Sequence, residues 1–471
     1  MTIEASVHAF PALAPSRRGR LFAVGEWMRT HQRALRVVQW IVVAVYAFMI
    51  VVPAFLPLPP EDAHWFNNLT VLAQWVFWGF WWPGVIASMF LLGRTWCGVF
   101  CPEGTLTEAT SRIGLGRGVP RWMRWGGWPF VAFALTTIFG QLVSVYQYAA
   151  ATLLVLGGST LAAVAVGFVY GRGKRVWCRH LCPVNGVFAV LSRVAPVHYR
   201  VDSDAWKDNA THIRVHPVNC APMVRIRRMT GPSECHMCAR CSGLRGSVEL
   251  AARAPNDEIV RMTPESARGW DAVLIVFGMI GIAIGAFEWS ASSAFVTLRT
   301  SVADWVIDHG PAWLLRDDAP WWLLTNYPEA KDVFTWLDGA LIVAWITVTA
   351  SIVGVWVVAW LMVAGRALSP RVLPRAIALS YALVPLAGAG LLVGLSGLTA
   401  TLAHAEGFHL AWLAPTRVLL LVAAAAWSAW LAYGQVRSGT THARSWVALS
   451  AFGMGVVGIL AAWMPFVFRV I

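Results

Sequence analysis

Long apolar segments recur along this chain of 471 residues, and they constrain the fold more than any other feature. A helix needs about 20 consecutive apolar residues to cross the hydrocarbon core of a bilayer. Only 13% of the residues are charged, compared with about 25% in soluble proteins. The sequence therefore predicts an all-α, polytopic integral membrane protein with about nine transmembrane helices. Their expected ranges are 36–56, 71–92, 127–146, 150–170, 270–289, 338–364, 375–402, 411–434 and 446–468.

The placement of arginine predicts the orientation of these helices. Positive residues collect in cytoplasmic loops, and the N-terminal tail, residues 1–35, is rich in arginine, including Arg17 and Arg18. The acidic segment 290–337 suits the opposite side. Nine spans place the C-terminus outside, whereas Arg469 favours an even number, so both counts stay open. The same arginine pattern accounts for the net charge of +13 through membrane lipid and topology, without a nucleic acid partner.

Four regions follow from this pattern. The cytoplasmic tail of residues 1–35 leads into a four-helix membrane unit over 36–196. Residues 197–269 are polar, rich in Arg, His and Pro, and show little helical or strand periodicity, which predicts a small irregular cytoplasmic insert. A second membrane bundle covers 270–471 and includes the outer segment 290–337.

Eight cysteines are concentrated between the second apolar segment and the end of the insert. Two C-x3-C-P motifs each follow an apolar segment and an arginine, Arg94 or Arg175, which predicts that each pair lies at a membrane surface. Most of the cysteines are too close in sequence for ordinary disulfides, and cytoplasmic thiols stay reduced. The motif cysteines are Cys97, Cys101, Cys178 and Cys182, and the insert cysteines are Cys220, Cys235, Cys238 and Cys241.

This number and spacing of cysteines favour two [4Fe-4S] clusters. Each cluster requires four thiolates, and short steps between cysteines let a loop wrap the cluster while its backbone amides point to the sulfurs. The proline after each motif turns the chain away from the cluster. Zinc also binds four thiolates, commonly as two C-x2-4-C pairs. A non-redox transporter with structural zinc therefore stays open as an alternative.

The motifs resemble those of the bacterial membrane-bound 4Fe-4S polyferredoxins, such as the NapH, NosR and CcoG proteins. The resemblance rests on W-C-G-V-F-C-P at residues 96–102 and W-C-R-H-L-C-P at residues 177–183, followed by the cysteines of the insert. It extends over residues 70–245. This resemblance implies two [4Fe-4S] clusters near the cytoplasmic face of the bacterial inner membrane, and a role in passing electrons across or along that membrane.

The chain departs from the family pattern after Cys241. Many family members repeat C-x2-C-x2-C-x3-C-P, whereas Cys241 is followed by S-G-L-R and no further cysteine. Cys220 can supply the missing fourth ligand. In bacterial ferredoxins, however, the C-P cysteine binds the other cluster, so Cys101 or Cys182 is an alternative. We favour the four motif cysteines as one ligand set and the four insert cysteines as the other.

Basic residues near the cysteines can offset the negative charge of a cluster and donate hydrogen bonds to it. The alternative is that they only set the topology or meet lipid phosphates. We assign Arg94 and Arg175 to this second kind, and for Arg240 and Arg245 both interpretations stay open. The candidates for direct influence on a cluster are Arg179, His180, His236, Arg240 and Arg245.

A second candidate site lies in an outer loop, where His404, Glu406 and His409 follow the end of an apolar segment. Two imidazoles and a carboxylate at a membrane surface could bind a metal or a quinol, or dock a periplasmic donor. The alternative is that these residues are solvated and cap helix ends.

The sequence favours an electron carrier over a self-contained enzyme, since it contains no Walker or dinucleotide-binding motif. We expect a relay of single electrons between the cytoplasm or membrane and a partner at the outer face. The long C-terminal bundle resembles that of the polyferredoxin component of FTR-type ferrous-iron uptake systems, which implies an iron permease and a periplasmic cupredoxin as partners. The alternative is a donor of electrons to a periplasmic reductase or to a metal-centre maturation system.

Overall fold

The computed structural model describes residues 19–208, 218–437 and 442–468. This part of the chain is predominantly helical and contains two short two-stranded sheets. Arg17 and Arg18, with the first half of the predicted tail, lie outside the described residues, as does Arg469. The predicted all-α, polytopic membrane fold is confirmed.

Eight of the described helices are long and apolar enough to cross a membrane. The remaining predicted segment, 127–146, forms the shorter helix α6 (Trp128–Leu142) of 15 residues. This helix is about 22 Å long, less than the apolar layer of about 30 Å. It ends because the chain turns at Ser144, which adopts a left-handed conformation with φ of 49°. The eight long helices are Gln32–Phe55, Leu69–Leu92, Ala149–Tyr170, Gly269–Ala291, Trp336–Leu368, Val372–Ala405, Leu413–Val436 and His442–Val467.

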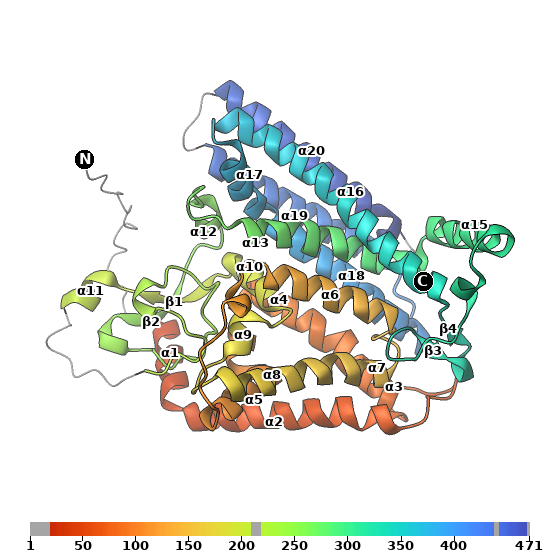
Figure 1. The fold of residues 1–471 in the computed structure, drawn as a ribbon. Coiled ribbons are helices and arrows are strands. Elements are labelled where there is room, and N and C mark those ends of the chain that lie inside the picture. Colours follow the sequence, from red (N-terminus) through yellow and green to blue (C-terminus); the bar gives the residue numbers. More distant parts are fainter. Residues whose placement is uncertain (1–18, 209–217, 438–441, 469–471) are drawn as a thin grey trace.

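The first membrane unit occupies the lower half of Figure 1, where α5 packs along α8 and beside α2. Asn68 starts α3, since its side chain accepts hydrogen bonds from the backbone of Thr70 and Val71. Two spans of this unit contain π-helical segments, Trp75–Trp81 and Leu153–Gly157. The elements are α1 (Arg20–Thr30), α2 (Gln32–Val51), α3 (Leu69–Gln74), α4 (Trp82–Leu92), α5 (Pro102–Arg112), α6, α7 (Ala149–Thr152), α8 (Gly158–Tyr170), α9 (Val176–His180) and α10 (Asn185–Leu191).

The insert is more regular than the sequence predicts. Strands β1 (Val197–Val201) and β2 (Val248–Ala252) pair antiparallel, and α1 packs on β2. A small core of Tyr199, Met237 and Leu250 lies beneath this sheet. The strands are five residues each, so their alternation is too short to stand out in the sequence. The insert also contains α11 (Ser203–Asp208) and α12 (Asp257–Val260).

The C-terminal bundle surrounds α18, which lies between the two membrane units (Figure 1). Gly388 and Gly394 let large side chains reach the α18 backbone, because a Cβ atom at these positions would lie 2.2 Å from Phe90 and 2.1 Å from Phe287. Small residues of this kind allow close helix packing in membranes. The helices are α13 (Gly269–Val273), α14 (Ala283–Glu288), α16 (Trp336–Leu368), α17 (Val372–Ser380), α18 (Val384–Ala405), α19 (Leu413–Val436) and α20 (His442–Val467).

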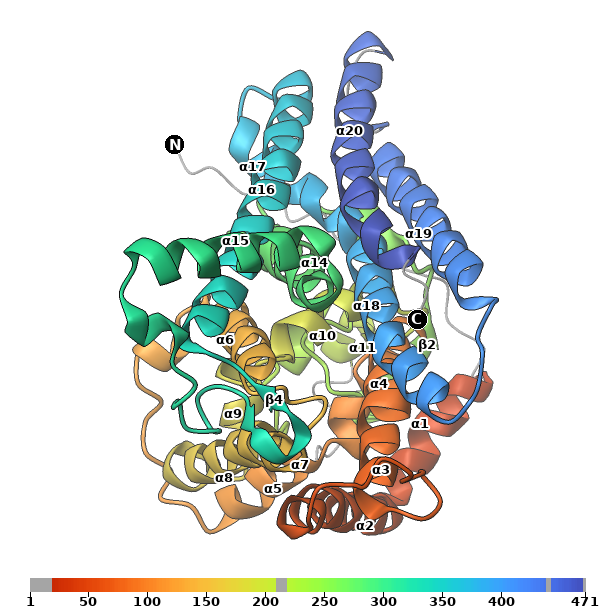
Figure 2. The ribbon, with the colours of Figure 1, turned by 90° about the vertical axis from the view of Figure 1, so that its right-hand side faces the viewer.

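The acidic outer segment folds at the opposite end of the molecule from the insert. In Figure 1 the insert lies at the left, and α15 (Ser293–His309) lies at the right with strands β3 (Asn326–Tyr327) and β4 (Asp332–Val333). Figure 2 views the molecule from that end. Arg299 of α15 forms an ion pair with Asp338 at the start of α16, with 2.5 Å between Nε and Oδ1. The two ends of the helix bundle therefore carry different structures, and the cysteines belong to the insert end.

Candidate iron-sulfur sites

The first C-x3-C-P motif folds back beside the membrane helices after α4. Gly93 ends α4 with a positive φ of 59°, a conformation that glycine adopts without strain. One π-helical turn over Trp96–Phe100 follows. Cys101 then caps α5, because its Sγ accepts a hydrogen bond from the backbone N–H of Gly104 at 3.3 Å. Helix geometry on both sides therefore fixes this cysteine pair.

The second motif lies on α9 and the turn after it, and it packs against α8. The thiol of Cys178 is buried next to Ala163 of α8 and Trp177. The indole N–H of Trp177 donates a hydrogen bond to the carboxylate of Glu103 at 2.9 Å. Glu103 belongs to α5, which begins at the first motif. The two motifs are therefore brought together by α5 and α8.

The four motif thiols lie close enough to influence one another's ionisation. Burial raises the pKa of Cys101 well above its usual value, and the neighbouring Cys178 and Cys97 raise it further. Burial also raises the pKa of Cys178 to about 12, and it raises the pKa of Cys182. Four such thiols do not lose their protons together unless positive charge is supplied. A bound metal supplies that charge and deprotonates its thiol ligands.

The C-x2-C-x2-C run forms a tight loop within the insert. Met237 and Ala239, one in each step between cysteines, adopt left-handed conformations with φ of 55° and 63°. Such alternation of backbone conformation produces concavities that bind anions. The backbone N–H of Met237 donates a hydrogen bond to Sγ of Cys235 at 3.4 Å. Burial raises the pKa of Cys235 to about 12, with further contributions from Cys238 and Cys220.

Cys220 joins these cysteines from an earlier stretch of the insert. The backbone N–H of Arg175 donates to the carbonyl of Ala221 at 2.8 Å, and the ammonium group of Lys174 donates to the carbonyl of Cys220 at 3.2 Å. Burial raises the pKa of Cys220, and the nearby Cys238 contributes. Cys220 therefore lies with the insert cysteines, in keeping with the predicted grouping. Its role as a ligand stays a prediction.

The donor sets offer the four thiols that each [4Fe-4S] cluster binds. All eight cysteines are free thiols. Within residues 19–208, 218–437 and 442–468, no three His, Cys, Asp or Glu side chains are grouped in a way that could hold one metal ion. A [4Fe-4S] cluster makes a different demand, since its thiolates bind separate irons. Each cysteine group offers four thiols and a backbone N–H that donates to sulfur, so both groups fit this demand.

A buried ion network joins the two cysteine groups. The carboxylate of Glu108, on α5, accepts hydrogen bonds from Arg175 Nε at 2.9 Å and pairs with Arg240 Nη2 at 2.8 Å. Arg175 also donates from Nη1 to the carbonyl of Cys97 at 2.5 Å, and Arg240 lies between Cys238 and Cys241. Although burial alone would raise it, the pKa of Glu108 is lowered by these two arginines. Glu108 is therefore an anionic link between the sites.

Arg94 is the second buried arginine at the motifs. Its side chain donates to the carbonyl of Ser233 at 2.7 Å and to Oδ1 of Asn185 at 2.6 Å, and its Nη2 lies 3.9 Å from Sγ of Cys97. Arg94 and Arg175 are only 3% and 2% exposed. The interpretation that these two arginines only set the topology is therefore wrong. Both hold the cysteine loops together from inside the protein.

Direct backbone contact also joins the two groups. A Cβ atom on Gly98 would lie 1.9 Å from the carbonyl oxygen of His236, so only glycine allows this approach. On α2, the amide of Gln39 donates to the carbonyl of Gly98 at 2.9 Å, and the amide of Gln32 donates to the carbonyl of Cys238 at 3.1 Å. Helix α2 therefore contacts one loop of each site.

The five basic residues predicted to surround the clusters occupy different positions. Arg179 forms an ion pair with Glu234 at 3.1 Å, which joins the second motif to the insert. His236 is buried, and burial lowers its pKa well below the usual value, with Arg94 adding to the shift. Burial also lowers the pKa of the half-buried His180. Arg240 belongs to the Glu108 network, and the guanidinium of Arg245 stacks on Trp206 with 5.1 Å to the ring centroid.

The predicted outer-face residues do not face a common centre. The rings of His404 and His409 meet edge to face with centroids 5.3 Å apart. Glu406 instead accepts hydrogen bonds from Nδ1 of His64 and from the backbone N–H of Trp65, both at 2.9 Å. Both partners lie in the loop between α2 and α3. Glu406 thus fastens the loop after α18 to the loop between α2 and α3, and this contact accounts for its position.

Sequence reasoning missed the two carboxylates of α5, Glu103 and Glu108. The carboxylate of Glu103 accepts hydrogen bonds from Ser159 and Trp177, and Glu108 joins the two sites. The sequence did contain a signal for these residues, because both are acidic and lie in an arginine-rich loop directly after a cysteine motif. Their basic partners, however, lie far away in sequence.

Comparison with known protein families finds a match at each of the two motif segments. Residues 74–120 and 154–201 match a family described as a 4Fe-4S binding domain. These are two separate matches to the family. Each match contains one C-x3-C-P motif, so the resemblance to the membrane-bound 4Fe-4S polyferredoxins is confirmed. The relation to FTR-type iron uptake stays a prediction.

The chain is also similar to a protein of Escherichia coli (strain K12) that is named "Putative electron transport protein YccM". The two are 24% identical over 228 residues, which is 42% of this chain and 62% of YccM. The chain thus spans less than two thirds of that relative. No solved structure matches the chain significantly. These similarities support an iron-sulfur electron-transfer role.

Proposed function

We propose that this protein is a membrane-bound one-electron carrier that holds two [4Fe-4S] clusters. One cluster is bound by the four motif cysteines and the other by the four insert cysteines. The observation that carries the proposal is the arrangement of eight free thiols in two adjacent groups of four. A [4Fe-4S] cluster, when bound, supplies a centre that accepts and returns single electrons.

The protein residues have separate tasks in this proposal. The thiols bind the irons, and the backbone N–H groups of Gly104 and Met237 donate to cysteine sulfurs, which stabilises added negative charge. Arg94 and Arg175 bring positive charge to the motif site without exposing it to water. Glu108 offsets part of the positive charge of Arg175 and Arg240.

We place the protein in the bacterial inner membrane, with the N-terminus and the insert in the cytoplasm. The arginine distribution supports this orientation through the positive-inside rule. The acidic outer segment, which includes α15, then faces the periplasm and is the surface for a redox partner. An iron permease with a cupredoxin is the first candidate system, and a periplasmic reductase or a metal-centre maturation system is the second. Purifying the protein from native membranes and identifying the proteins that co-purify with it distinguishes these candidates.

The proposal is tested by purifying the full chain without oxygen and measuring iron, zinc and acid-labile sulfide. Two clusters require about eight irons and eight sulfides per chain, and an EPR signal that appears on reduction. A colourless protein with about one or two zinc ions per chain would instead support structural zinc sites. That result would refute the electron-carrier function.

A further inference from the structure

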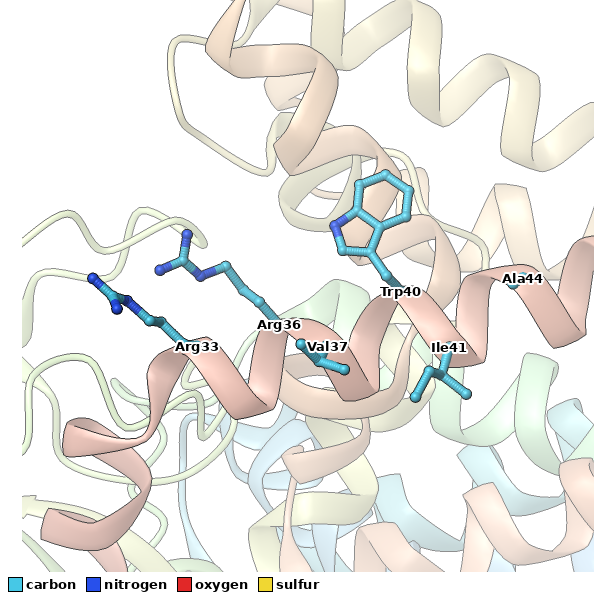
Figure 3. Close-up of a pocket in the computed structure, with 6 residues that line it drawn as sticks. All are labelled: Arg33, Arg36, Val37, Trp40, Ile41 and Ala44. Carbon is cyan, nitrogen blue, oxygen red and sulfur yellow. The ribbon is translucent and has the colours of Figure 1, made fainter.

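The exposed face of α2 marks where the apolar layer begins on the side of the insert. Figure 3 shows Arg33 and Arg36 followed along α2 by Val37, Trp40 and Ile41. These last three side chains are 59%, 50% and 57% exposed. A change from arginine to exposed apolar side chains, with tryptophan at the boundary, is typical of a membrane interface. The apolar layer therefore begins near Arg36.

The pairing of α5 with α8 gives the depth of the first motif. The two helices run parallel toward the end of the span at Tyr170. At the start of α5, Glu103 accepts a hydrogen bond from Ser159 Oγ at 2.6 Å, whereas the later turns of α5 contact Gly167. Ser159 lies eleven residues before Tyr170, which corresponds to about 16 Å along a helix. Cys101, which caps the start of α5, lies at this depth.

Helix α2 gives the same depth independently. The hydroxyl of Tyr46 forms a hydrogen bond with Oγ1 of Thr160 at 2.9 Å, next to Ser159, which contacts the start of α5. Tyr46 lies ten residues after Arg36, about 15 Å along the helix. The insert contacts the other end of α2, where Gln32 donates to the carbonyl of Cys238. The two cysteine groups therefore lie at different levels along α2.

We infer that the site of Cys97, Cys101, Cys178 and Cys182 lies within the apolar layer, with Cys101 at about its middle, whereas the insert site meets the edge of the layer, where Gly98 contacts Gln39. The inference rests on the proposed function. An electron that passes from the insert site to the side of the motif site at Cys101 then crosses up to half of the apolar layer. The prediction that both motifs lie at a membrane surface does not hold for the first motif under this inference.

The distance that remains to the outer face is about half the layer, or about 15 Å. Aromatic side chains occupy this half, with Tyr46 against Phe77 at 5.9 Å between ring centroids and Trp78 against Tyr146 at 4.7 Å. At the outer end, Tyr148 stacks on a tyrosine of β3, and all of these rings belong to one packed cluster. Electron tunnelling slows exponentially with distance. A site inside the apolar layer therefore shortens the longest electron transfer of a transmembrane relay.

The depth is measured by the EPR relaxation of each reduced cluster in lipid nanodiscs, with a water-soluble dysprosium chelate as the probe. The Cys235→Ser variant isolates the motif site, and the Cys178→Ser variant isolates the insert site. We expect the chelate to speed the relaxation of the insert cluster at least several-fold more than that of the motif cluster. Equal effects on both would overturn the inference. If one variant does not fold, the wild-type protein gives the same contrast through its two signals.

A second test uses the full-length protein in sealed liposomes under an imposed potential. A charge that crosses half of a 100 mV potential changes the ratio of the two reduced clusters by about sevenfold, at 59 mV per tenfold for one electron. A ratio that does not respond to the potential would contradict the central position. Failure of the proposed function is distinguished by the iron and sulfide content, because a cluster-free protein gives neither signal.

Discussion

The two cysteine sites offer the same number of thiols but rest on different scaffolds. The motif site is formed at helix termini, with Cys101 capping α5 and Cys178 on α9, and its charges are buried between helices. The insert site is formed by a loop in which Met237 and Ala239 adopt left-handed conformations and which packs against a small two-stranded sheet. One site is therefore fixed by helix packing, and the other by local backbone conformation. The residues that connect the two sites decide whether the sites fold and unfold together.

Replacing Gly98 with alanine should lower the folding stability of the two connected sites more than any other substitution. The added Cβ atom would lie 1.9 Å from the carbonyl of His236, and neither backbone can move without opening the contact. We expect a loss of about 3 kcal/mol of folding free energy, at the upper end for overpacking. Thermal unfolding in detergent checks it, with Gly118→Ala as the control, since nothing lies within 4 Å of a Cβ atom there. Equal stability of the two variants would show that the sites are independent.

Glu108→Gln should weaken the connection between the two sites without enlarging the side chain. The substitution leaves Arg175 and Arg240 without their buried anion, and breaking a buried ion pair costs about 3 kcal/mol. Arg112→Gln is the matched control, because Arg112 contacts the same carboxylate from the exposed side, with 54% of its side chain accessible. Its loss should cost less than about 1 kcal/mol. Hydrogen exchange of residues 97–101 and 235–241 should increase only in Glu108→Gln; unchanged exchange in that variant counts against the bridge.

Acid should weaken the insert scaffold through His198 of β1. Burial, with Arg253 and Arg200 nearby, lowers the pKa of His198 to about 4. The folded insert keeps this imidazole neutral, whereas the unfolded chain binds a proton below about pH 6.5. The stability that the neutral His198 contributes to folding is therefore present well above pH 6.5 and declines as the pH falls toward 4, by about 1.4 kcal/mol at pH 5.5.

The measurement for His198 is the hydrogen exchange of β1 at pH 7.5 and 5.5, corrected for intrinsic rates. His198→Gln should reduce the pH dependence, whereas His404→Gln, at the outer end, should leave it intact. An unaltered pH dependence in His198→Gln would show that another group is responsible.

Glu406→Gln should have the smallest effect, because Glu406 joins two outer loops far from both sites. Its partner His64 is 41% exposed, so the cost should stay below about 1 kcal/mol. Iron per chain should equal that of the wild type, as measured by elemental analysis. A loss of iron would instead connect the outer loop to the cysteine sites, and would revive the hypothesis of an outer-face metal.

The sequence predicts the membrane helices well, because each is a continuous apolar run. The segment 127–146 is the exception, since the turn at Ser144 shortens it. The cysteine spacing likewise favours two ligand sets of four thiols, and this grouping stays a prediction. The ion network could not be predicted, because Glu108 is separated from Arg175 and Arg240 by 67 and 132 residues. Nor does an apolar run reveal that the chain folds back after Gly93 and places Cys101 near the start of α8, at the middle of the span Ala149–Tyr170.

The most direct test of two separate four-thiolate sites is Mössbauer spectroscopy of protein enriched in 57Fe and prepared without oxygen. The wild type should contain about eight irons in two cubes. Cys178→Ser should lose one cube and Cys235→Ser the other, so that the two variants retain complementary halves of the wild-type spectrum. If the variants retained the same half, or if either lost all of its iron while staying folded, the division of the eight cysteines into these two sites would be contradicted.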